Sequence, residues 1–292
     1  MMQIAIYGRK ISKQNLKSFY NVFELIQSFG WNLIIEEDLA NSIVQKKAMD
    51  FPYKTFNSEK DLKSGVDLVI SMGGDGTFLK CVSYIKNSDV PIMGINLGRL
   101  GFLANVSLDQ ISEALHDIKA KKYVFQKRSL LKVKVEGTLN GEYFAMNELT
   151  IHKKDTTSMV AVNVSLDDNF LNTYWSDGLI VSTPTGSTAY NLSCGGPIIT
   201  PGCQVHIITP IAAHNLNVRP VVVPDHMPIK LSVEGRNRSY LMSIDGKSIS
   251  IKQGQEIKIT KADFMINVIK FENNNFLDTI RNKMLWGSDK RN

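Results

Sequence analysis

The first hundred residues alternate between short apolar runs and amphipathic stretches, and this alternation restricts the possible folds more than any other feature. Apolar runs predict strands over 3–7, 31–35, 67–71 and 91–95. Apolar residues at helical spacing predict helices between them, over 16–29, 39–49 and 77–85. Strands that alternate with helices require right-handed crossovers, so this part of the chain is predicted to form a parallel sheet.

After about residue 105 the apolar pattern changes to a period of two. A helix is predicted over 108–120, and short alternating segments follow it over 131–135, 143–146, 160–166, 221–223, 229–233, 239–243, 249–251 and 257–259. Such segments predict an all-β, sandwich-like domain. We therefore expect an α/β domain over 1–105, a β-rich domain over 106–272, and a helical segment over 273–292 that could pack back on the first domain.

Composition excludes several classes of protein. A chain of 292 residues is long enough for about two domains of roughly 150 residues each. Apolar residues make up 43% and charged residues 21%, which excludes a disordered chain. No apolar run reaches the ~18 residues of a membrane span, and the N-terminus lacks a signal-peptide pattern. Cys81, Cys194 and Cys203 lack Cys-x-x-Cys spacing, which disfavours disulfides and zinc and indicates the cytoplasm.

The charge balance is mildly basic. The chain has 34 Lys and Arg against 28 Asp and Glu, a net charge of +6. This balance suits an anionic ligand such as a nucleotide. The charges are spread along the chain and accompany no recognised nucleic-acid module, so we expect neither nucleic acid nor a membrane as a partner.

The sharpest local motif is Gly73-Gly74-Asp75-Gly76-Thr77, which follows a predicted strand and precedes a predicted helix. Open α/β sheets bind ligands at the carboxyl ends of their strands. The glycines let the backbone approach a phosphate, and the N–H groups at the helix start favour an anion. Asp75 has two interpretations: it acts on a hydroxyl group or reaches a phosphate through a metal ion, or it only caps the helix.

Two further segments carry polar residues between apolar ones. Residues 177–190 read DGLIVSTPTGSTAY, and their hydroxyl groups can bind ribose or phosphate oxygens or cap a helix. Asn147-Glu148 ends a short strand and could clamp a ribose or a base edge. The sequence lacks a Walker A motif and the spaced Rossmann glycines, and its five histidines do not cluster.

Taken in this order, these segments resemble the NAD kinase family. The resemblance extends to Thr209-Pro210-Ile211-Ala212, His214, Arg219-Pro220 and Asp245-Gly246, so it covers most of the chain. The glycine motif is shared with diacylglycerol and sphingosine kinases and, in related form, with phosphofructokinases, whereas the 177–190 segment is more specific. The resemblance implies a Rossmann-like first domain of the phosphofructokinase and diacylglycerol kinase type.

The resemblance also implies a reaction and a set of site residues. The γ-phosphoryl group of ATP would pass to the 2′-hydroxyl of the NAD adenosine ribose, giving NADP, with Asp75 as proton acceptor. Gly73, Gly74, Gly76 and Thr77 would form the phosphate loop. The residues implied to bind NAD are Asp75, Gly76, Lys80, Asn147, Glu148, Ser158, Trp175, Asp177, Thr188, Ala189, Tyr190, Asn191, Leu192, Ser193, Ala212 and Lys247.

Cofactors and assembly follow from the same resemblance. A divalent metal, usually Mg²⁺, accompanies ATP, and no residue of this chain is assigned to it. Family members form homodimers or tetramers and complete the NAD site with a neighbouring subunit. Trp175 and Ser158 stand where many bacterial members carry basic or imidazole side chains, and Asn191 and Cys194 replace smaller residues. Two rivals remain: a lipid or sugar kinase with the same glycine motif, and a non-catalytic dinucleotide sensor.

Overall fold

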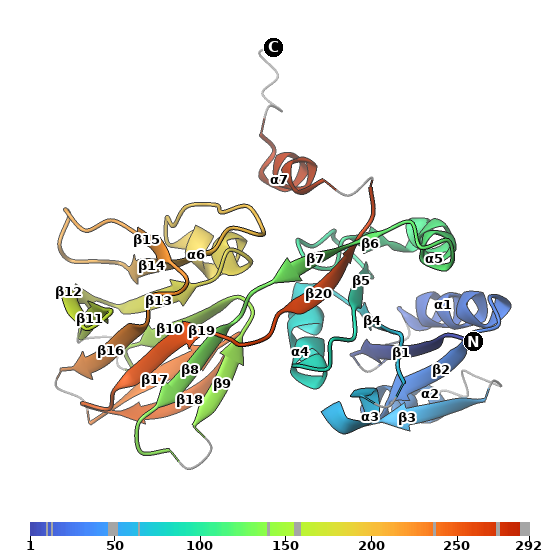
Figure 1. The fold of residues 1–292 in the computed structure, drawn as a ribbon, viewed down its shortest axis with the longest axis horizontal. Coiled ribbons are helices and arrows are strands. Elements are labelled where there is room, and N and C mark those ends of the chain that lie inside the picture. The colour runs from blue at the N-terminus through green and yellow to red at the C-terminus, as the bar shows by residue number, and fades with distance from the viewer. Residues whose placement is uncertain are drawn as a thin grey trace. The chain divides into compact units, whose positions relative to one another are not determined.

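The structure is a computed structural model, which describes residues 1–9, 11–12, 14–45, 52–63, 65–138, 141–154, 159–235, 238–272 and 275–286. The chain divides into two compact units (Figure 1). Unit 1 comprises Met1–Lys127 and Ile266–Asn292, and unit 2 comprises Arg128–Met265. Each unit has its own hydrophobic core.

Unit 1 contains an eight-stranded sheet in the order β3-β2-β1-β4-β5-β20-β7, with β6 beside β5. Every pairing among β1 to β6 is parallel, as is the pairing of β20 with β5. The strands are β1 (Gln3–Gly8), β2 (Asn32–Glu36), β3 (Tyr53–Phe56), β4 (Leu68–Met72), β5 (Ile92–Asn96), β6 (Val106–Ser107), β7 (Val124–Arg128) and β20 (Ile266–Lys270). The expected parallel sheet is confirmed.

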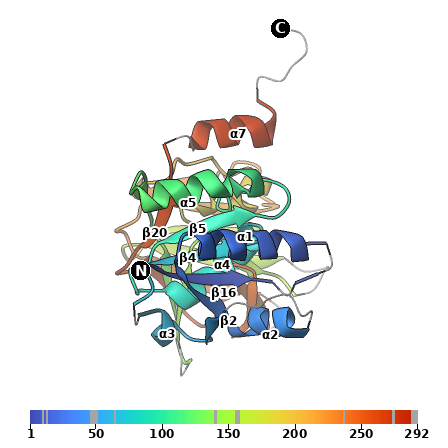
Figure 2. The ribbon, with the colours of Figure 1, turned by 90° about the vertical axis from the view of Figure 1, so that its right-hand side faces the viewer.

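Helices cover this sheet on both sides. Figures 1 and 2 show α1 and α5 together on one side and α3 on the other. Phe19, Phe23 and Ile26 recur at helical spacing along α1 and are buried, which is why this segment is helical and faces the core. The helices are α1 (Leu16–Ser28), α2 (Glu37–Gln45), α3 (Glu59–Lys63), α4 (Asp75–Ile85), the 3₁₀ turn η1 (Leu108–Gln110), α5 (Ile111–Lys119) and α7 (Phe276–Met284).

Unit 2 contains two six-stranded antiparallel sheets that share one core. The first has the order β15-β14-β13-β10-β17-β18: Val221–Pro224, Val205–Ile211, Gly178–Ser182, Glu148–His152, Ser239–Ile244 and Lys247–Lys252. The second has the order β12-β11-β16-β19-β8-β9: Asn169–Ser176, Val160–Leu166, Ile229–Glu234, Ile257–Lys261, Leu131–Val135 and Glu142–Ala145. Two short helical segments, η2 (Gly186–Thr188) and α6 (Tyr190–Ser193), follow β13. The expected β-rich fold is confirmed.

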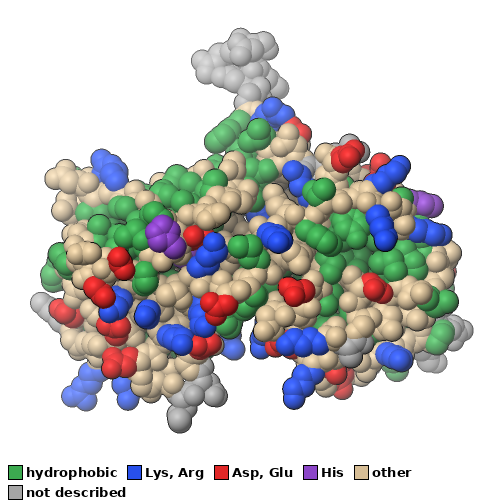
Figure 3. Space-filling view, in the orientation of Figure 1, with side chains coloured by type: hydrophobic (Ala, Val, Ile, Leu, Met, Phe, Trp, Pro, Cys, Tyr) green, Lys and Arg blue, Asp and Glu red, His purple; other side chains and the backbone are tan. Residues whose placement is uncertain are grey.

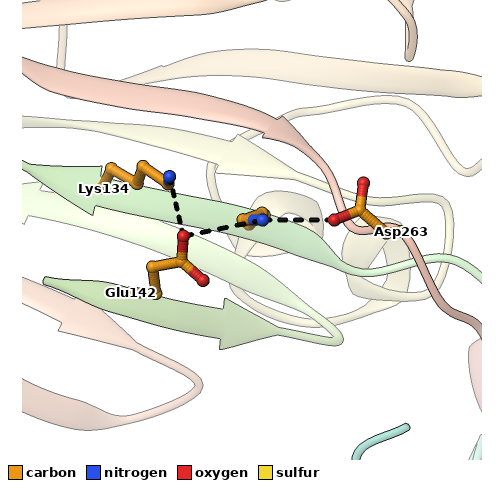
Figure 4. Close-up of polar contacts among 4 residues, drawn as sticks. Lys134, Glu142 and Asp263 are labelled. Atoms are coloured by element: carbon orange, nitrogen blue, oxygen red, sulfur yellow. Dashed lines mark hydrogen bonds and ion pairs between the residues drawn. The ribbon is translucent and has the colours of Figure 1, made fainter.

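Alternation explains why these segments form strands with one buried face. In β8 the apolar residues point into the core, whereas Lys132 and Lys134 point outward. Lys132 and Lys134 both pair with Glu142 on β9, and Lys132 also pairs with Asp263 (Figure 4). Because Glu142 and Asp263 are exposed, solvent screens these pairs and each of them contributes little to stability. This network stabilises the surface of the sheet and forms no part of the candidate site.

The boundaries of the two units differ from the expected domain boundaries. Residues 106–127 belong to unit 1, because α5 packs in the same core as α1. The chain re-enters unit 1 at Ile266, where β20 pairs with β5, and α7 lies in unit 1 as well. The predicted helix over 39–49 corresponds to α2, which ends at Gln45, and residues 46–51 lie outside the described residues.

Figure 3 shows side chains of both charge signs intermixed on the face in view, without a single basic patch. Among the described residues, no helix is both long enough and apolar enough to cross a membrane.

Candidate functional site

In unit 1 the candidate site lies where three neighbouring parallel strands end. β4 lies between β1 and β5 in the sheet, so the segments that follow these strands meet at one edge. Arg9 follows β1, the Gly73–Thr77 motif follows β4, and Leu97 follows β5. All three line a cavity of about 270 Å³, together with Asn15 and Phe19 of the α1 region. Among the described residues that line this cavity, none is acidic.

The glycine motif connects β4 to α4 in little space. A side chain at Gly73 would collide with Thr77, whose Cβ lies 2.7 Å from the position that a Cβ would occupy. Thr77 is buried and its N–H donates to the Gly74 carbonyl, which closes the turn. Gly76 is exposed, and Arg9 Nη2 lies 3.8 Å from the position of a Cβ there. The loop therefore presents exposed backbone and one guanidinium group to the cavity, an arrangement that suits an anion.

Asp75 is the first residue of α4, and its carboxylate accepts three backbone hydrogen bonds. The N–H of Phe102 donates to Oδ2 over 2.9 Å, and those of Leu103 and Ala104 donate to Oδ1 over 3.0 Å each. Gly101 must lack a side chain, because a Cβ there would overlap Oδ1 of Asp75. Of the roughly four lone pairs of a carboxylate, three are used, and one on Oδ2 is left for a ligand.

The C-terminal helix supports the segment that binds Asp75. The ring of Phe102 lies 6.3 Å from that of Phe276, centroid to centroid, and Lys283 Nζ lies 4.7 Å from the Phe102 ring centroid. Phe276 and Lys283 belong to α7, and Phe102 donates to Asp75. The position of the Asp75 carboxylate thus depends on packing from the far end of the chain.

In unit 2 a second carboxylate makes the same kind of contact. Asp245 accepts the N–H groups of Met146, Asn147 and Glu148, over 2.7, 2.9 and 3.1 Å. We call residues 146–148 the 146–148 turn. Thr183 fixes its other side, because Thr183 N–H donates to the Asn147 carbonyl and its hydroxyl donates to the Met146 carbonyl. The backbone of the turn is therefore held from two directions.

The side chains of this turn have unused hydrogen-bonding capacity. Asn147 Oδ1 and Glu148 Oε2 are buried and have no hydrogen-bond partner among the described residues. Buried polar atoms are nearly always paired in folded proteins, so these two adjacent atoms are available to a ligand or to water. Burial, together with the charge of Asp245, raises the pKa of Glu148 to about 8, and only the Tyr190 N–H acts against this.

Strand β10 connects the 146–148 turn to a second group of predicted residues. At its far end the ring of His152 stacks on that of Tyr190, 5.8 Å away, and Lys153 Nζ pairs with Asp177 Oδ1 at 2.5 Å. Asp177 N–H donates to the Ile211 carbonyl, next to Ala212. The structure thereby brings Glu148, Tyr190, Asp177 and Ala212 along one strip of unit 2. Four residue steps of β10 span about 13 Å.

The predicted residues over 188–193 differ in what their side chains do. Thr188, Ala189 and Leu192 are half-buried, and Tyr190 and Ser193 are exposed. Asn191 is fully buried: its amide donates to the carbonyls of Ser187 and Pro197, and it accepts from Thr209. A Cβ at Gly196 would overlap this amide. The Asn191 side chain therefore shapes the loop, and only its backbone is available to a ligand.

The other predicted residues lie at the margins of these groups. Trp175 is exposed at the end of β12, and its carbonyl accepts from His214 N–H. Ala212 is exposed with a positive φ of 47°. Lys247 is exposed at the start of β18, two residues after Asp245, and Lys80 is exposed on α4. Ser158 lies outside the described residues.

The geometry adds residues that the sequence did not single out as site residues. These are Arg9 at the cavity, His152 and Lys153 on the strip, and Asp245 under the 146–148 turn. Asp245-Gly246 is a hairpin signal in the sequence, but that signal predicts a turn and not a buried contact. Arg9 directly follows the first strand, a position that marks it as a candidate once the strand order is known.

Comparison with known proteins gives a consistent result over the whole chain. The family models "ATP-NAD kinase N-terminal domain" and "ATP-NAD kinase C-terminal domain" match residues 4–123 and 146–271. The NAD kinase of Flavobacterium psychrophilum is 45% identical over 100% of both chains. The NAD kinase of Cytophaga hutchinsonii is 39% identical over 100% of both chains.

Two solved structures share the fold. Yeast NADH kinase complexed with NADH superposes with a TM-score of 0.89 at 24% identity, covering 100% of this chain and 89% of that chain. An NAD kinase from Archaeoglobus fulgidus in complex with ATP gives a TM-score of 0.73 at 25% identity, covering 97% of this chain and 99% of that chain. The chain therefore belongs to the NAD kinase family and is a phosphotransferase.

Proposed function

We propose that this chain transfers the γ-phosphoryl group of ATP to the 2′-hydroxyl of the adenosine ribose of NAD, producing NADP and ADP. The observation that carries the proposal is the setting of Asp75. Its carboxylate is held by three N–H groups, stands beside a cavity with a guanidinium group, and retains one lone pair. The names of the relatives and the ATP in the Archaeoglobus fulgidus structure support the choice of substrates.

In the proposed step the 2′-oxygen forms a bond to the γ-phosphorus while the bond from that phosphorus to the bridging oxygen of ADP breaks. The hydroxyl proton passes to the remaining lone pair on Oδ2 of Asp75. Phosphoryl transfer has a loose transition state, so this proton moves late and positioning supplies most of the rate. The rigid hold on Asp75 serves positioning, because the carboxylate has no freedom to turn away.

Unit 2 supplies the proposed NAD contacts. Asn147 Oδ1 and Glu148 Oε2, the two orphaned atoms, hold the adenosine, with Glu148 at the ribose hydroxyls. The strip along β10 adds Asp177, Tyr190 and Ala212. The remaining proposed contacts are Trp175, the backbone of 188–193, Lys247 and, outside the described residues, Ser158.

A divalent metal, Mg²⁺, is proposed to enter with ATP. The described residues contain no group of three His, Cys, Asp or Glu side chains able to hold a metal ion by themselves. Mg²⁺ commonly binds through substrate phosphates with one or two carboxylates, so a metal held mainly by the triphosphate fits these residues. When bound, it neutralises phosphate charge.

Assembly and location are proposed from the family and from the cysteines. We propose a homodimer or homotetramer in which a neighbouring subunit completes the NAD site. The exposed Trp175 and Tyr190 would then lie near that subunit. All three cysteines are free thiols, which supports a reducing cytoplasm.

The first experiment detects NADP directly. Purified protein is incubated with NAD, ATP and Mg²⁺, with parallel arms for NADH and polyphosphate, and NADP is measured with an NADP-specific dehydrogenase. Asp75→Asn should lower kcat on the order of 10²-fold or more, because an amide cannot take the proton. Asp38→Asn, an exposed aspartate in the first turn of α2, is the matched control and should leave kcat unchanged.

The remaining outcomes separate the rival functions. Near wild-type kcat in Asp75→Asn would reject the acceptor role. NAD binding without NADP formation in any arm would favour the sensor. Absence of both NAD binding and NADP would point to a kinase for lipids or sugars.

A further inference from the structure

Asp245 has a place in unit 2 that the proposed NAD contacts do not explain. It occupies the β17–β18 hairpin turn with Gly246, at positive φ angles of 46° and 81°. This two-residue Asp-Gly connection is typical of a type I′ turn, which needs no carboxylate contact to form. Yet the Asp245 carboxylate reaches residues 97 to 99 positions away in sequence and accepts all three N–H groups of the 146–148 turn.

The backbones of the β17–β18 hairpin and the 146–148 turn are also hydrogen-bonded to each other. Asp245 N–H donates to the Glu148 carbonyl over 3.1 Å, so the hairpin and the turn are linked by four hydrogen bonds. Hydrogen bonds to a charged acceptor are the strong ones. Asn147 and Glu148 extend their side chains from this fixed backbone. Asn147 Oδ1 and Glu148 Oε2 have no hydrogen-bond partner among the described residues.

We propose that Asp245 is a positioning residue for NAD: its carboxylate holds the 146–148 turn in the conformation that directs Asn147 and Glu148 at the adenosine. This inference rests on the proposed function for the identity of the ligand. It deepens that function, because it assigns NAD affinity to a residue that makes its contacts only with the protein backbone.

Asp245 has a second effect on the same site. Three N–H groups stabilise its ionised form, although burial raises the pKa of Asp245. Burial of Glu148 and, after it, the charge of Asp245 raise the pKa of Glu148 to about 8. A protonated carboxyl group donates a hydrogen bond, and a ribose hydroxyl oxygen can accept it.

The other groups that face Glu148 do not titrate in this range. Cys194 lies near Glu148, and burial raises the pKa of its thiol. Burial also raises the pKa of the Tyr190 phenol, whose backbone N–H donates to Glu148. Asp245 is therefore the described charged group that adds to the effect of burial on the pKa of Glu148.

The test is Asp245→Asn, because asparagine tolerates the positive φ but removes the charge and one acceptor oxygen. KM for NAD should rise about tenfold or more, the loss of roughly one charge-assisted hydrogen bond, while KM for ATP stays within about twofold. The matched control is Asp168→Asn. Asp168 also lies on a hairpin turn of unit 2 with positive φ, and its exposed carboxylate pairs with Lys230 on the surface.

A pH profile distinguishes positioning of the ligand from general stability. In the wild-type chain KM for NAD should rise near pH 8 as Glu148 loses its proton. Asp245→Asn should move this midpoint to lower pH. Glu148→Gln, which has no titratable group at this position, should remove the step. An Asp245→Asn variant with wild-type KM for NAD and an unmoved midpoint would overturn the proposal.

Two measurements keep the outcomes separate. NAD binding by calorimetry needs no turnover, so weaker binding in Asp245→Asn would uphold this inference even if no NADP forms and the proposed function fails. Circular dichroism reports folding of each variant. Should Asp245→Asn not fold, Asp245→Ser, which keeps one acceptor oxygen, decides the matter: weaker NAD binding supports the inference, and wild-type NAD binding overturns it.

Discussion

Asp75 in unit 1 and Asp245 in unit 2 are held in the same way but lie in different surroundings. Each carboxylate accepts the N–H groups of three consecutive residues, 102–104 for Asp75 and 146–148 for Asp245. Asp75 begins a helix beside a cavity with a guanidinium group, whereas Asp245 lies in a hairpin turn beside a second carboxyl group, Glu148. Identical hydrogen bonding therefore does not fix the role of a carboxylate.

The difference lies in the charges around each carboxylate. Asp75 lies between Gly74 and Gly76, which line a cavity together with the positive side chain of Arg9. At Asp245 the neighbouring carboxyl group is Glu148, whose pKa is raised by its burial and by the charge of Asp245. In unit 1 the glycine motif exposes backbone beside the single carboxylate of Asp75. In unit 2 the pKa of Glu148 depends on its burial and on the charge of Asp245.

The largest expected effect comes from breaking the hold on Asp75 while leaving the carboxylate in place. In Gly101→Ala the new Cβ would overlap Oδ1 of Asp75, so the three hydrogen bonds cannot all persist. We expect kcat to fall on the order of 10²-fold, the typical result of misplacing a reacting group by about 1 Å. Steady-state kinetics checks this, with Gly98→Ala as the control, because a Cβ at Gly98 would meet nothing within 4 Å. Wild-type kcat in Gly101→Ala would show that the tether is dispensable.

The corresponding change in unit 2 should act on affinity and stability. A Cβ at Gly186 would overlap the Asn147 carbonyl oxygen and lie 2.5 Å from the carbonyl carbon, and backbone atoms cannot yield as a side chain can. Gly186→Ala should lower the free energy of unfolding by about 3 kcal/mol, at the upper end of ordinary overpacking. It should also raise KM for NAD more than it lowers kcat. Urea unfolding and steady-state kinetics test this. An effect confined to kcat would contradict the expectation that unit 2 acts on the affinity for NAD.

A smaller loss of stability is expected at acidic pH, and it should come from His206 in unit 2. His206 is fully buried, and neither ring nitrogen has a hydrogen-bond partner among the described residues. Burial lowers its pKa to about 4, with Asp225 opposing and Lys261 reinforcing the shift. Because the folded pKa lies below the ordinary value of 6.5, the stabilisation is complete above pH 6.5 and is lost between 6.5 and 4. At pH 5 the loss is about 2 kcal/mol.

Denaturant unfolding at pH 7 and pH 5 measures this loss. His206→Leu fills the same interior without a titratable group, so its stability should fall less between the two pH values. Equal pH dependence in both chains would show that other groups account for the acid sensitivity.

Much of the fold was open to prediction because it depends on local patterns. Apolar spacing identified α1, β4 and β8 within one or two residues, and the change of period marked the second fold type. The glycine motif predicted a turn between β4 and α4 with Asp75 at the helix start. These features are set by residues close together in the sequence, so their physical cause can be read there.

The contacts that make the site depend on residues far apart in the sequence. Asp75 meets partners 27 to 29 residues away, and Asp245 meets partners 97 to 99 residues away. Residues 266–270 fall within the range expected for the β-rich domain, yet β20 pairs with β5 in unit 1. The elements, the glycine loop and the family resemblance follow from residues close together in the chain. The backbone N–H groups that each aspartate binds and the raised pKa of Glu148 follow from folding, because both depend on burial and on charges that distant segments bring together.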